Sequence, residues 1–451
     1  MVVDKLGNIK MKPSKYNIFF NYKGKQLAFN TLSTGFAEIN DNFVRILNSL
    51  ECLNIGSLSK QDKDLIQNMK RGNFIIDDDY DELNAIKFNS YSGKFCSDRF
   101  DLTIAPTLQC NFDCPYCYEE RKSGIMSSDI INFIYDKIKR EAEKKHNIFI
   151  TWYGGEPLLA KDLIFEMSQQ IMKICSAQKV KYNSYIITNG YLINEDIAGA
   201  FKKFHIRGAQ ITVDGPPFIH NSRRKLRSGK ADTFDVIIEN IKKLLNNDID
   251  VNIRINIDKT NIRSIEELLD IFIQNGLQGC NISLGQVKNY TNMCRSRETD
   301  NLTNEQYAEI ILRSQDIFLE RGFKVLNYPC YPSLKANYCC ADSINSFVID
   351  YDGKIYKCLN DIGNKNKIVG DVKEPINLYN KLNIEYLMWS PFNYKKCIKC
   401  KLLPICMGGC PYLGLKYKKA ECEKWKYNLL DVLKVRYDNY CLQRKNYLRL
   451  D

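Results

Sequence analysis

Short apolar runs alternate with longer amphipathic stretches between residues 101 and 290. The apolar runs are residues 102–105, 148–153, 185–188, 209–213, 251–257 and 281–284. The stretches between them carry apolar residues at helical spacing, at 127–145, 161–176, 194–204, 232–247 and 262–275. This alternation predicts an α/β fold in which crossover helices connect parallel strands. Six strand–helix units are too few for a closed eight-stranded barrel.

The first 95 residues follow a different pattern. Residues 16–20 and 27–30 flank a Lys-Gly turn and predict a hairpin, and residues 36–39 predict a third strand. Asn40 or Asp41 is placed to cap a helix with apolar positions at Phe43, Ile46, Leu47 and Leu50. A second helix is expected near residues 59–69, and residues 72–76 suggest a wing. The pattern predicts a separate N-terminal unit of three strands and three short helices.

Residues suited to chemistry follow each of the first four predicted strands. In parallel barrels the active site lies at the carboxyl ends of the strands, so these segments are expected to meet. They are residues 110–117, 154–157, 188–190 and 212–217.

The first of these segments carries three thiols, Cys110, Cys114 and Cys117, on one short loop. Iron–sulfur clusters are held by thiolates and normally take four. Three local cysteines therefore leave one iron open for a substrate or cofactor. A structural zinc site needs four ligands, and no fourth Cys or His stands nearby.

Composition narrows the chemistry further. The chain has 451 residues, 18 cysteines and three histidines, and its formal charge is +12. The sequence has no secretory start and no apolar run long enough to span a membrane, so we expect a cytoplasmic protein without a membrane partner. Cysteines in such a chain indicate metal binding rather than disulfides. The spread of lysines is more typical of a solvated face, or one that attracts an acidic substrate, than of nucleic-acid binding.

A second group of cysteines lies near the C-terminus: Cys340, Cys358, Cys397, Cys400, Cys406, Cys410 and Cys422. Residues 348–356 predict a hairpin with an Asp-Gly turn that would bring Cys340 and Cys358 together. Taken alone, Cys397, Cys400, Cys406 and Cys410 would also suit a zinc ribbon. The remaining cysteines, Cys52, Cys96, Cys175, Cys280, Cys294 and Cys441, have no partner at ligand spacing and are expected to be small core residues.

The Cys-x3-Cys-x2-Cys loop resembles the signature of radical S-adenosylmethionine (SAM) enzymes. The resemblance implies a partial (β/α)6 barrel, a [4Fe-4S] cluster on Cys110, Cys114 and Cys117, and SAM bound to the open iron. Cleavage of SAM then yields a 5′-deoxyadenosyl radical.

The same resemblance assigns contacts with SAM. Gly154, Gly155 and Glu156 match the family's glycine-rich segment, and Arg224 is expected to bind the SAM carboxylate. Tyr116 is expected against the adenine, and Asn189, Thr212 and Asp214 lie where relatives contact the ribose and methionine groups.

The seven C-terminal cysteines resemble a SPASM domain, which carries auxiliary clusters in many peptide-modifying radical SAM enzymes. The resemblance implies a first auxiliary [4Fe-4S] cluster on Cys340, Cys358 and Cys410, and a second on Cys397, Cys400, Cys406 and Cys422. Cys330 or Cys339 would close the first cluster, or one of its irons stays open. The expected domains are residues 1–95, 96–290, 291–336 (a bridge with a helix near 303–321) and 337–451, which ends in a helix.

The N-terminal unit resembles a winged-helix-like peptide-recognition domain, on which a leader peptide adds as a strand. Together the resemblances predict a maturase that forms a thioether between a cysteine sulfur and a carbon of a ribosomally made precursor peptide. A reductant such as flavodoxin or ferredoxin is expected. The alternatives are formylglycine formation as in sulfatase maturation, carbon–carbon cross-linking, and a non-catalytic iron–sulfur or zinc scaffold that binds peptide or nucleic acid. The sequence does not reveal a general base.

Overall fold

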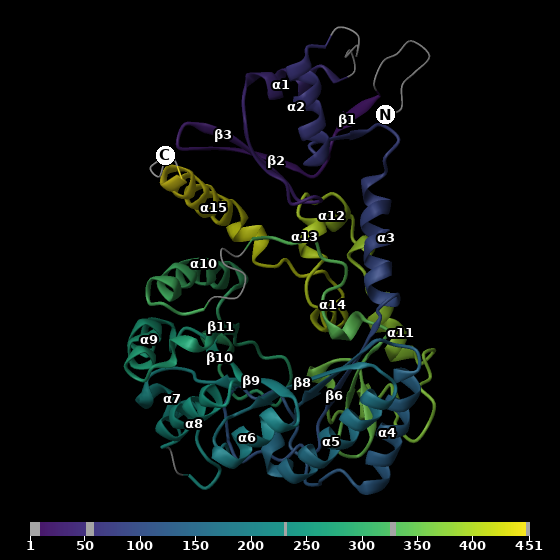
Figure 1. The fold of residues 1–451 in the computed structure, drawn as a ribbon, viewed down its shortest axis with the longest axis vertical. Helices are drawn as coiled ribbons and strands as arrows, with labels where there is room; N and C mark the ends of the chain where they lie inside the picture. The colour runs from purple at the N-terminus through teal and green to yellow at the C-terminus, as the bar shows by residue number, and fades with distance from the viewer. Residues whose placement is uncertain (1–9, 51–57, 230–231, 325–330, 448–451) are drawn as a thin grey trace.

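The computed structural model describes residues 10–50, 58–229, 232–324 and 331–447 (Figure 1). Within these residues no helix combines the length and the apolar character needed to cross a bilayer. A large sheet with its helices forms one end of the molecule, and a smaller unit built from the N-terminal residues forms the other (Figure 1).

The large sheet has six parallel strands in chain order. They are β6 (Arg99–Ile104), β7 (Asn147–Trp152), β8 (Lys181–Thr188), β9 (Ile206–Thr212), β10 (Asp250–Ile257) and β11 (Asn281–Gln286). The helices between them are α4 (Ser128–Ala142), α5 (Lys161–Ala177), α6 (Glu195–Lys203), α7 (Pro217–Arg223), α8 (Phe234–Asn246) and α9 (Ile265–Gln274). All six predicted strands and five predicted helices are confirmed, and α7 is a short helix that the pattern did not predict.

Alternation within the strands gives the sheet two different faces. In β10, Val251, Ile253 and Ile255 are buried, whereas the residues between them are only partly buried. The buried side belongs to one large core shared with the helices, which includes Ile164, Ile237 and Leu268. Polar residues on the other side of the sheet are therefore available for a site.

Three further strands extend this sheet beyond β6. Strand β12 (Ser346–Ile349) pairs parallel to β6, and β13 (Lys354–Tyr356) and β14 (Gly370–Asp371) follow in antiparallel order. The predicted hairpin is confirmed, but its attachment to β6 was not predicted. The segment carrying Cys340 and Cys358 is thus fixed to the sheet that carries the Cys110 loop.

The N-terminal sheet consists of β2 (Asn17–Tyr22), β3 (Lys25–Asn30) and β4 (Phe36–Ile39). Helix α1 (Asp41–Asn48) is capped by the Asn40 side chain, and α2 (Lys60–Arg71) by that of Ser59. The cap at Asn40 agrees with the sequence prediction, and α2 begins where the second helix was expected. Strand β5 (Ile75–Asp77) pairs with β1 (Met11–Pro13), a strand that the sequence did not predict.

The N-terminal sheet packs directly on the C-terminal cysteine segment. Phe29 lies in one core with Ile405, Trp425 and Leu433, and Tyr16 lies in another with Leu403 and Met407. Lys401 donates its Nζ to the Asn17 carbonyl at 2.8 Å. The helices that complete this region are α3 (Glu82–Phe95), α10 (Asn304–Glu320), α11 (Lys381–Met388), α12 (Lys395–Ile398), α13 (Leu403–Cys406), α14 (Pro411–Tyr417) and α15 (Trp425–Tyr447).

Candidate functional site

The Cys110 loop directly follows β6 and is held by backbone hydrogen bonds from three other segments. The Glu156 N–H donates to the Gln109 carbonyl at 2.7 Å, and the Arg227 N–H donates to the Asn111 carbonyl at 2.8 Å. The Arg295 N–H donates to the Pro115 carbonyl at 2.7 Å. These bonds give the loop one shape although it has no regular secondary structure.

The three thiols of this loop are reduced, partly buried and close enough to affect one another. Burial raises the pKa of Cys110, Cys114 and Cys117, in the last case to about 12, and Cys114 raises the pKa of the other two further. Among the described residues no group of three His, Cys, Asp or Glu is arranged to hold one metal ion. That finding concerns single ions, whereas a four-iron cluster takes its ligands on separate irons.

Gly154 and Gly155 bring the end of β7 against the backbone that leads into the cysteine loop. A Cβ on Gly154 would overlap the Thr107 carbonyl oxygen, and one on Gly155 would overlap that of Gln109. Gly154 also has a φ of +136°, which L side chains rarely adopt. The pair leaves room for backbone only, which fits a segment that approaches a bound cofactor closely.

Replacement of Gly154 by alanine is therefore expected to displace residues 107–109 and to lower both iron content and thermal stability. Gly199, inside α6, is the matched control, because a Cβ there meets nothing within 4 Å. Gly199→Ala is expected to stabilise the protein by about 0.5–1 kcal/mol. Iron analysis and thermal unfolding of the two variants test this, and normal iron content in Gly154→Ala would contradict it.

The Glu156 carboxylate is fully buried and joins the segment that follows β7 to the end of β8. It accepts hydrogen bonds from the Thr188 hydroxyl at 2.7 Å, from the Asn189 N–H at 2.7 Å and from the Leu158 N–H at 3.0 Å. Burial raises its pKa. The sequence predicted Glu156 as a SAM contact, and the structure gives it in addition a role in fixing Asn189, whose amide donates to Asn111 of the cysteine loop at 2.7 Å.

Tyr116, Asp214 and Arg224 form one hydrogen-bonded group beside the cysteine loop. The Tyr116 hydroxyl donates to Asp214, and Arg224 Nη1 donates to that hydroxyl at 2.8 Å. Arg224 Nε is buried without a partner among the described residues. A buried guanidinium with an unused donor fits an anionic group such as the SAM carboxylate.

Two neighbouring residues that the sequence did not single out for a role support this group. Arg223 bonds Asp258 at 2.8 Å and lies over the Tyr116 ring at 5.2 Å. His220 accepts the Asp214 N–H at Nδ1, and burial lowers its pKa well below the usual value, so its ring is neutral. In the sequence, the position of Arg223 next to Arg224 was the signal that could have pointed to its role. Thr212 lies at the end of β9, partly buried.

Known proteins resemble this chain in the region that forms the site. Residues 104–272 match the model of the Radical SAM superfamily, which covers the cysteine loop, the Gly154 segment and the Arg224 group. The chain contains a radical SAM domain. Over 323 residues the chain is also 27% identical to the cysteine-type anaerobic sulfatase-maturating enzyme of Clostridium novyi, and this alignment covers 67% of this chain and 84% of that protein.

Two solved structures share the fold of the radical SAM domain and of the regions around it. The anSMEcpe structure with bound AdoMet and the Cp18Cys peptide aligns at a TM-score of 0.60 and 21% identity, over 75% of this chain and 99% of that one. Streptococcus suis SuiB, bound to its precursor peptide SuiA, aligns at a TM-score of 0.54 and 18% identity, over 92% of this chain and 98% of that one. The SuiB alignment thus leaves little of this chain uncovered.

Outside the radical SAM domain, the structure brings the C-terminal cysteines into two groups. Burial raises the pKa of the Cys358 thiol, and Cys410 and Cys340 lie close enough to raise it further. Burial likewise raises the pKa of Cys397, to which Cys400 and Cys422 contribute. The Cys406 thiol accepts a hydrogen bond from the Glu423 N–H, directly after Cys422. The two ligand sets that the sequence resemblance implied stay predictions.

The remaining cysteines are a mixed set. Cys175 and Cys280 are buried as expected, whereas Cys96 is exposed, because it follows the end of α3, and that expectation was wrong. Cys294 and Cys441 are partly buried. Cys339 lies beside Cys340, while Cys330 and Cys52 lie outside the described residues.

Proposed function

We propose that this protein is a radical SAM enzyme that forms a thioether cross-link in a ribosomally synthesised precursor peptide. The observation that carries the proposal is the arrangement of one chain: a radical SAM loop, two groups of cysteines beside it, and an N-terminal sheet docked on them. Relatives named for sulfatase maturation and for a precursor-peptide complex support a peptide as the substrate class. The proposed domains are residues 1–95, 96–290, 291–336 and 337–451.

The proposed cofactors are SAM and three [4Fe-4S] clusters, one held by Cys110, Cys114 and Cys117 and two by the C-terminal cysteines. Bound SAM would supply a 5′-deoxyadenosyl radical that removes a hydrogen atom from a peptide carbon. The chain would orient this chemistry, and we assign Arg224, Asp214, Asn189 and Tyr116 to contacts with the bound cofactor. Cross-linking removes a second electron, which the first auxiliary cluster would accept, and the thiol proton leaves to solvent.

The proposed leader site is the outer edge of β4, which pairs only with β3 in the described sheet. The Asn30 N–H donates to the Gly35 carbonyl at 2.9 Å. Bonded and non-bonded pairs alternate in an antiparallel ladder, so the backbone of Phe36, the next residue, faces away from β3. An edge of this kind accepts an added peptide strand.

Formylglycine formation is the second candidate function, because the Clostridium novyi relative is a sulfatase-maturating enzyme. In that family an Asp follows the cysteine at the position of Cys358. This chain has Leu359 there, and it carries the N-terminal unit in addition. Carbon–carbon cross-linking is the third candidate.

The test is anaerobic turnover of cysteine-containing peptides by the reconstituted enzyme with SAM and reductant. A thioether product is expected, lighter by two hydrogens and resistant to alkylation by iodoacetamide. A carbon–carbon link gives the same mass with an alkylatable thiol. Formylglycine instead loses the sulfur and reacts with hydroxylamine. Either of the last two outcomes, or SAM cleavage without any peptide product, contradicts the thioether assignment.

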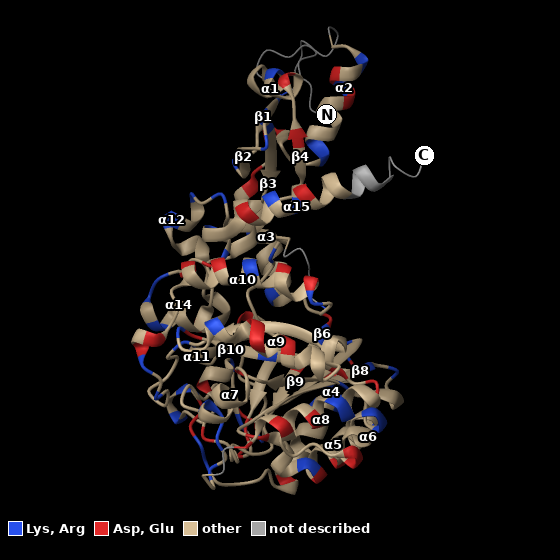
Figure 2. Ribbon diagram, turned by 90° about the vertical axis from the view of Figure 1, so that its left-hand side faces the viewer, with Lys and Arg blue, Asp and Glu red and all other residues tan. Residues whose placement is uncertain are grey.

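The proposed reductant is an acidic electron carrier such as flavodoxin or ferredoxin, docked on a lysine face over Cys397 and Cys400. Seven exposed lysines form this face: Lys395, Lys396, Lys399, Lys401, Lys416, Lys418 and Lys419. None of them has an ion pair within the part of the chain that the structure describes. Figure 2 shows Lys and Arg gathered around α12 and α14.

Reduction by flavodoxin is therefore expected to slow as ionic strength rises, because salt screens exposed charges. Changing Lys395, Lys399, Lys416 and Lys418 to Glu is expected to slow it by at least about tenfold. Stopped-flow bleaching of cluster absorbance measures the rate. Glu substitutions at Lys161 and Lys173, exposed on α5, are the control, and equal slowing in both variants would contradict this docking face.

A further inference from the structure

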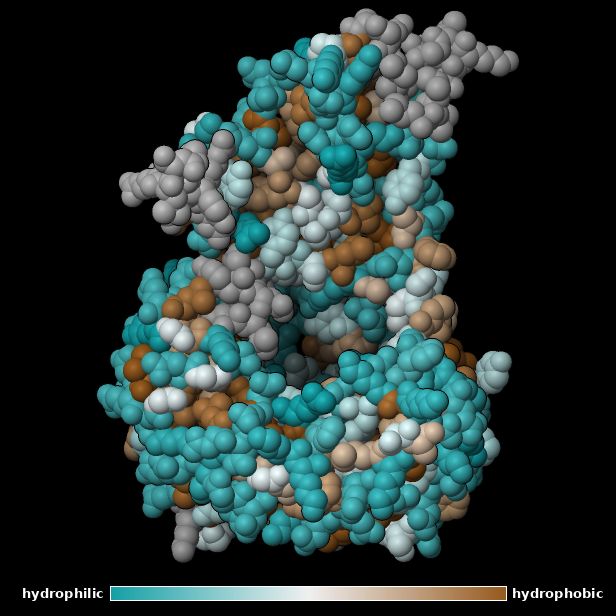
Figure 3. All heavy atoms as spheres, viewed as in Figure 1, coloured by the Kyte–Doolittle hydropathy of each residue, from teal (hydrophilic) through white to brown (hydrophobic). Residues whose placement is uncertain are grey.

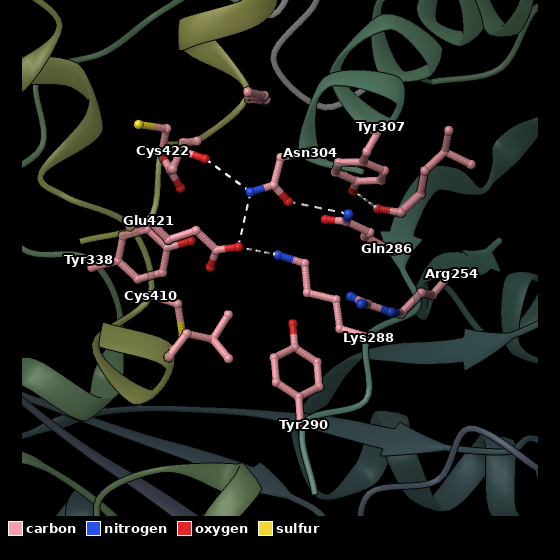
Figure 4. Close-up of a pocket in the computed structure, with 16 residues that line it drawn as sticks. Arg254, Gln286, Lys288, Tyr290, Asn304, Tyr307, Tyr338, Cys410, Glu421 and Cys422 are labelled. Atoms are coloured by element: carbon pink, nitrogen blue, oxygen red, sulfur yellow. Dashed lines mark hydrogen bonds and ion pairs between the residues drawn. The ribbon is translucent and has the colours of Figure 1, made fainter. Parts of the chain in front are cut away.

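A cavity of about 260 Å³ lies between the radical SAM domain and the C-terminal cysteine segment. One wall comes from β10 and β11 with the residues that follow, and the opposite wall from Cys410 and residues 421–424 (Figure 4). In the space-filling view a hollow opens between the two ends of the molecule (Figure 3). No residue of the cavity other than Cys410 and Cys422 was singled out by the sequence.

Most polar groups in the cavity wall already bind one another. Glu421 pairs with Lys288 at 2.9 Å and accepts from Asn304 at 3.0 Å. Asn304 also donates to the Cys422 carbonyl, and Gln286 donates to the Leu302 carbonyl at 2.9 Å. The charge of Lys288 is therefore matched by Glu421 before any ligand enters.

Arg254 is different. Its Nε donates to Asn256 at 2.9 Å, but its two terminal amino groups have no hydrogen bond or ion pair with any described residue. Figure 4 shows this guanidinium beside the Lys288 side chain, directed toward the cavity. A Cβ on Gly285 would stand 2.6 Å from Arg254 Cζ, so only glycine at 285 leaves room for the group in this position.

The position of Arg254 links the cavity to the SAM contacts. Arg254 is in register with Thr212 on the neighbouring strand, and Asn256, which holds its Nε, donates its N–H to Asp214 at 3.0 Å. The guanidinium thus stands between the proposed SAM site and Cys410. A ligand here would lie within reach of both.

We propose that Arg254 binds a carboxylate of the peptide substrate and so selects an acidic residue, or the peptide's C-terminus, next to the site of modification. The inference rests on the proposed function, because it takes the substrate to be a peptide. A guanidinium fork matches a carboxylate in two parallel hydrogen bonds. The SAM carboxylate is assigned to Arg224, which leaves Arg254 for the substrate.

The experiment compares three pentapeptides on the reconstituted enzyme with SAM, by anaerobic titration calorimetry. The first is acetyl-Gly-Cys-Gly-Asp-Gly-amide, the second replaces Asp by Asn, and the third is the Asn peptide with a free C-terminal carboxylate. At least one carboxylate peptide is expected to bind about tenfold more tightly than the neutral Asn amide. Preference for the first peptide identifies a side-chain carboxylate, and preference for the third identifies the C-terminus.

Arg254→Met is expected to remove this preference, whereas Arg254→Lys keeps part of it. Arg263→Met, outside the cavity, is the control and should keep the full ratio. Equal binding of all three peptides by the wild type, no measurable binding of any, or an unchanged ratio in Arg254→Met overturns the proposal. Loss of SAM affinity in Arg254→Met with an unchanged ratio also overturns it.

The outcome is separable from that of the proposed function. Carboxylate binding is measured without turnover, so an Arg254-dependent preference would stand even if the peptide product proved to carry no thioether. Conversely, a thioether product formed without any such preference would leave the proposed function intact and remove this inference alone.

Discussion

A variant with Cys110, Cys114 and Cys117 all replaced by alanine is expected to lose about four of about twelve irons and all reductive SAM cleavage. The three thiols are the protein ligands that we assign to the SAM-binding cluster, and the loop that carries them is fixed by hydrogen bonds from residues 156, 227 and 295. Those bonds use backbone groups, so the loop should keep its shape without the thiols. The loss is therefore expected to be chemical rather than a general unfolding.

Iron, sulfide and zinc counted per chain after anaerobic reconstitution measure the first effect, and 5′-deoxyadenosine formation measures the second. The matched control replaces Cys96, Cys175 and Cys280 by alanine, since none of them belongs to a ligand group, and its iron content should equal that of the wild type. A wild type with about four irons and zinc elsewhere would remove the auxiliary clusters from the proposed mechanism. SAM cleavage that persists in the triple variant would contradict the assignment of the loop.

Phe36→Pro is expected to lower the affinity for a precursor peptide by at least about tenfold while SAM cleavage continues. Proline removes the Phe36 N–H, which faces outward from β4, and its ring obstructs a strand added there. Proline is tolerated at the first residue of an edge strand, and Phe36 has that place. The measurements are peptide binding and 5′-deoxyadenosine formation on the same preparation.

Phe19→Pro is the matched control, because it places proline at the other edge of the same sheet. In the sheet register Phe19 lies opposite Ala28, and its side chain is 45% exposed. This change should therefore spare peptide binding. Phe36→Ala measures what is lost when the ring no longer packs on Phe29 and Tyr437. If the two proline variants bind peptide equally well, the leader does not add to β4.

A deletion of the N-terminal unit is a poorer test of the same idea. Phe29 and Tyr16 are buried in cores shared with Trp425 and Leu403, and these would be exposed by the deletion. Loss of peptide turnover in a truncated protein would then reflect either the missing leader site or the exposed cores. Single substitutions on the edge of β4 separate these two causes.

Local pattern was enough to predict most strands and helices of the large sheet and of the N-terminal sheet. Apolar periodicity predicted the six strands β6 to β11, and the polar residues Asn40 and Asp41 before an apolar run predicted the cap of α1. The strand ends also meet as expected for a parallel sheet, whereas the site residues assigned from the motifs stay predictions.

Pairings between distant segments were not predictable in this way. Strand β12 joins β6 although 245 residues separate Ser346 from Asp101, and nothing local in either segment encodes the partner. Strand β1 has only three residues, too few for a period to be read. The position of Arg254 depends on Gly285 of the next strand, a contact made only in the folded sheet.

The packing of the N-terminal sheet on the cysteine segment limits how this protein can be recombined. Hydrogen bonds from Lys15 to the Ile398 carbonyl and from Lys401 to the Asn17 carbonyl cross the boundary at which a domain exchange would be made. A chimaera that takes its peptide specificity from another maturase should therefore import residues 397–433 together with the first 95. Grafting the N-terminal unit alone would leave mismatched surfaces next to the residues that we assign to the second auxiliary cluster.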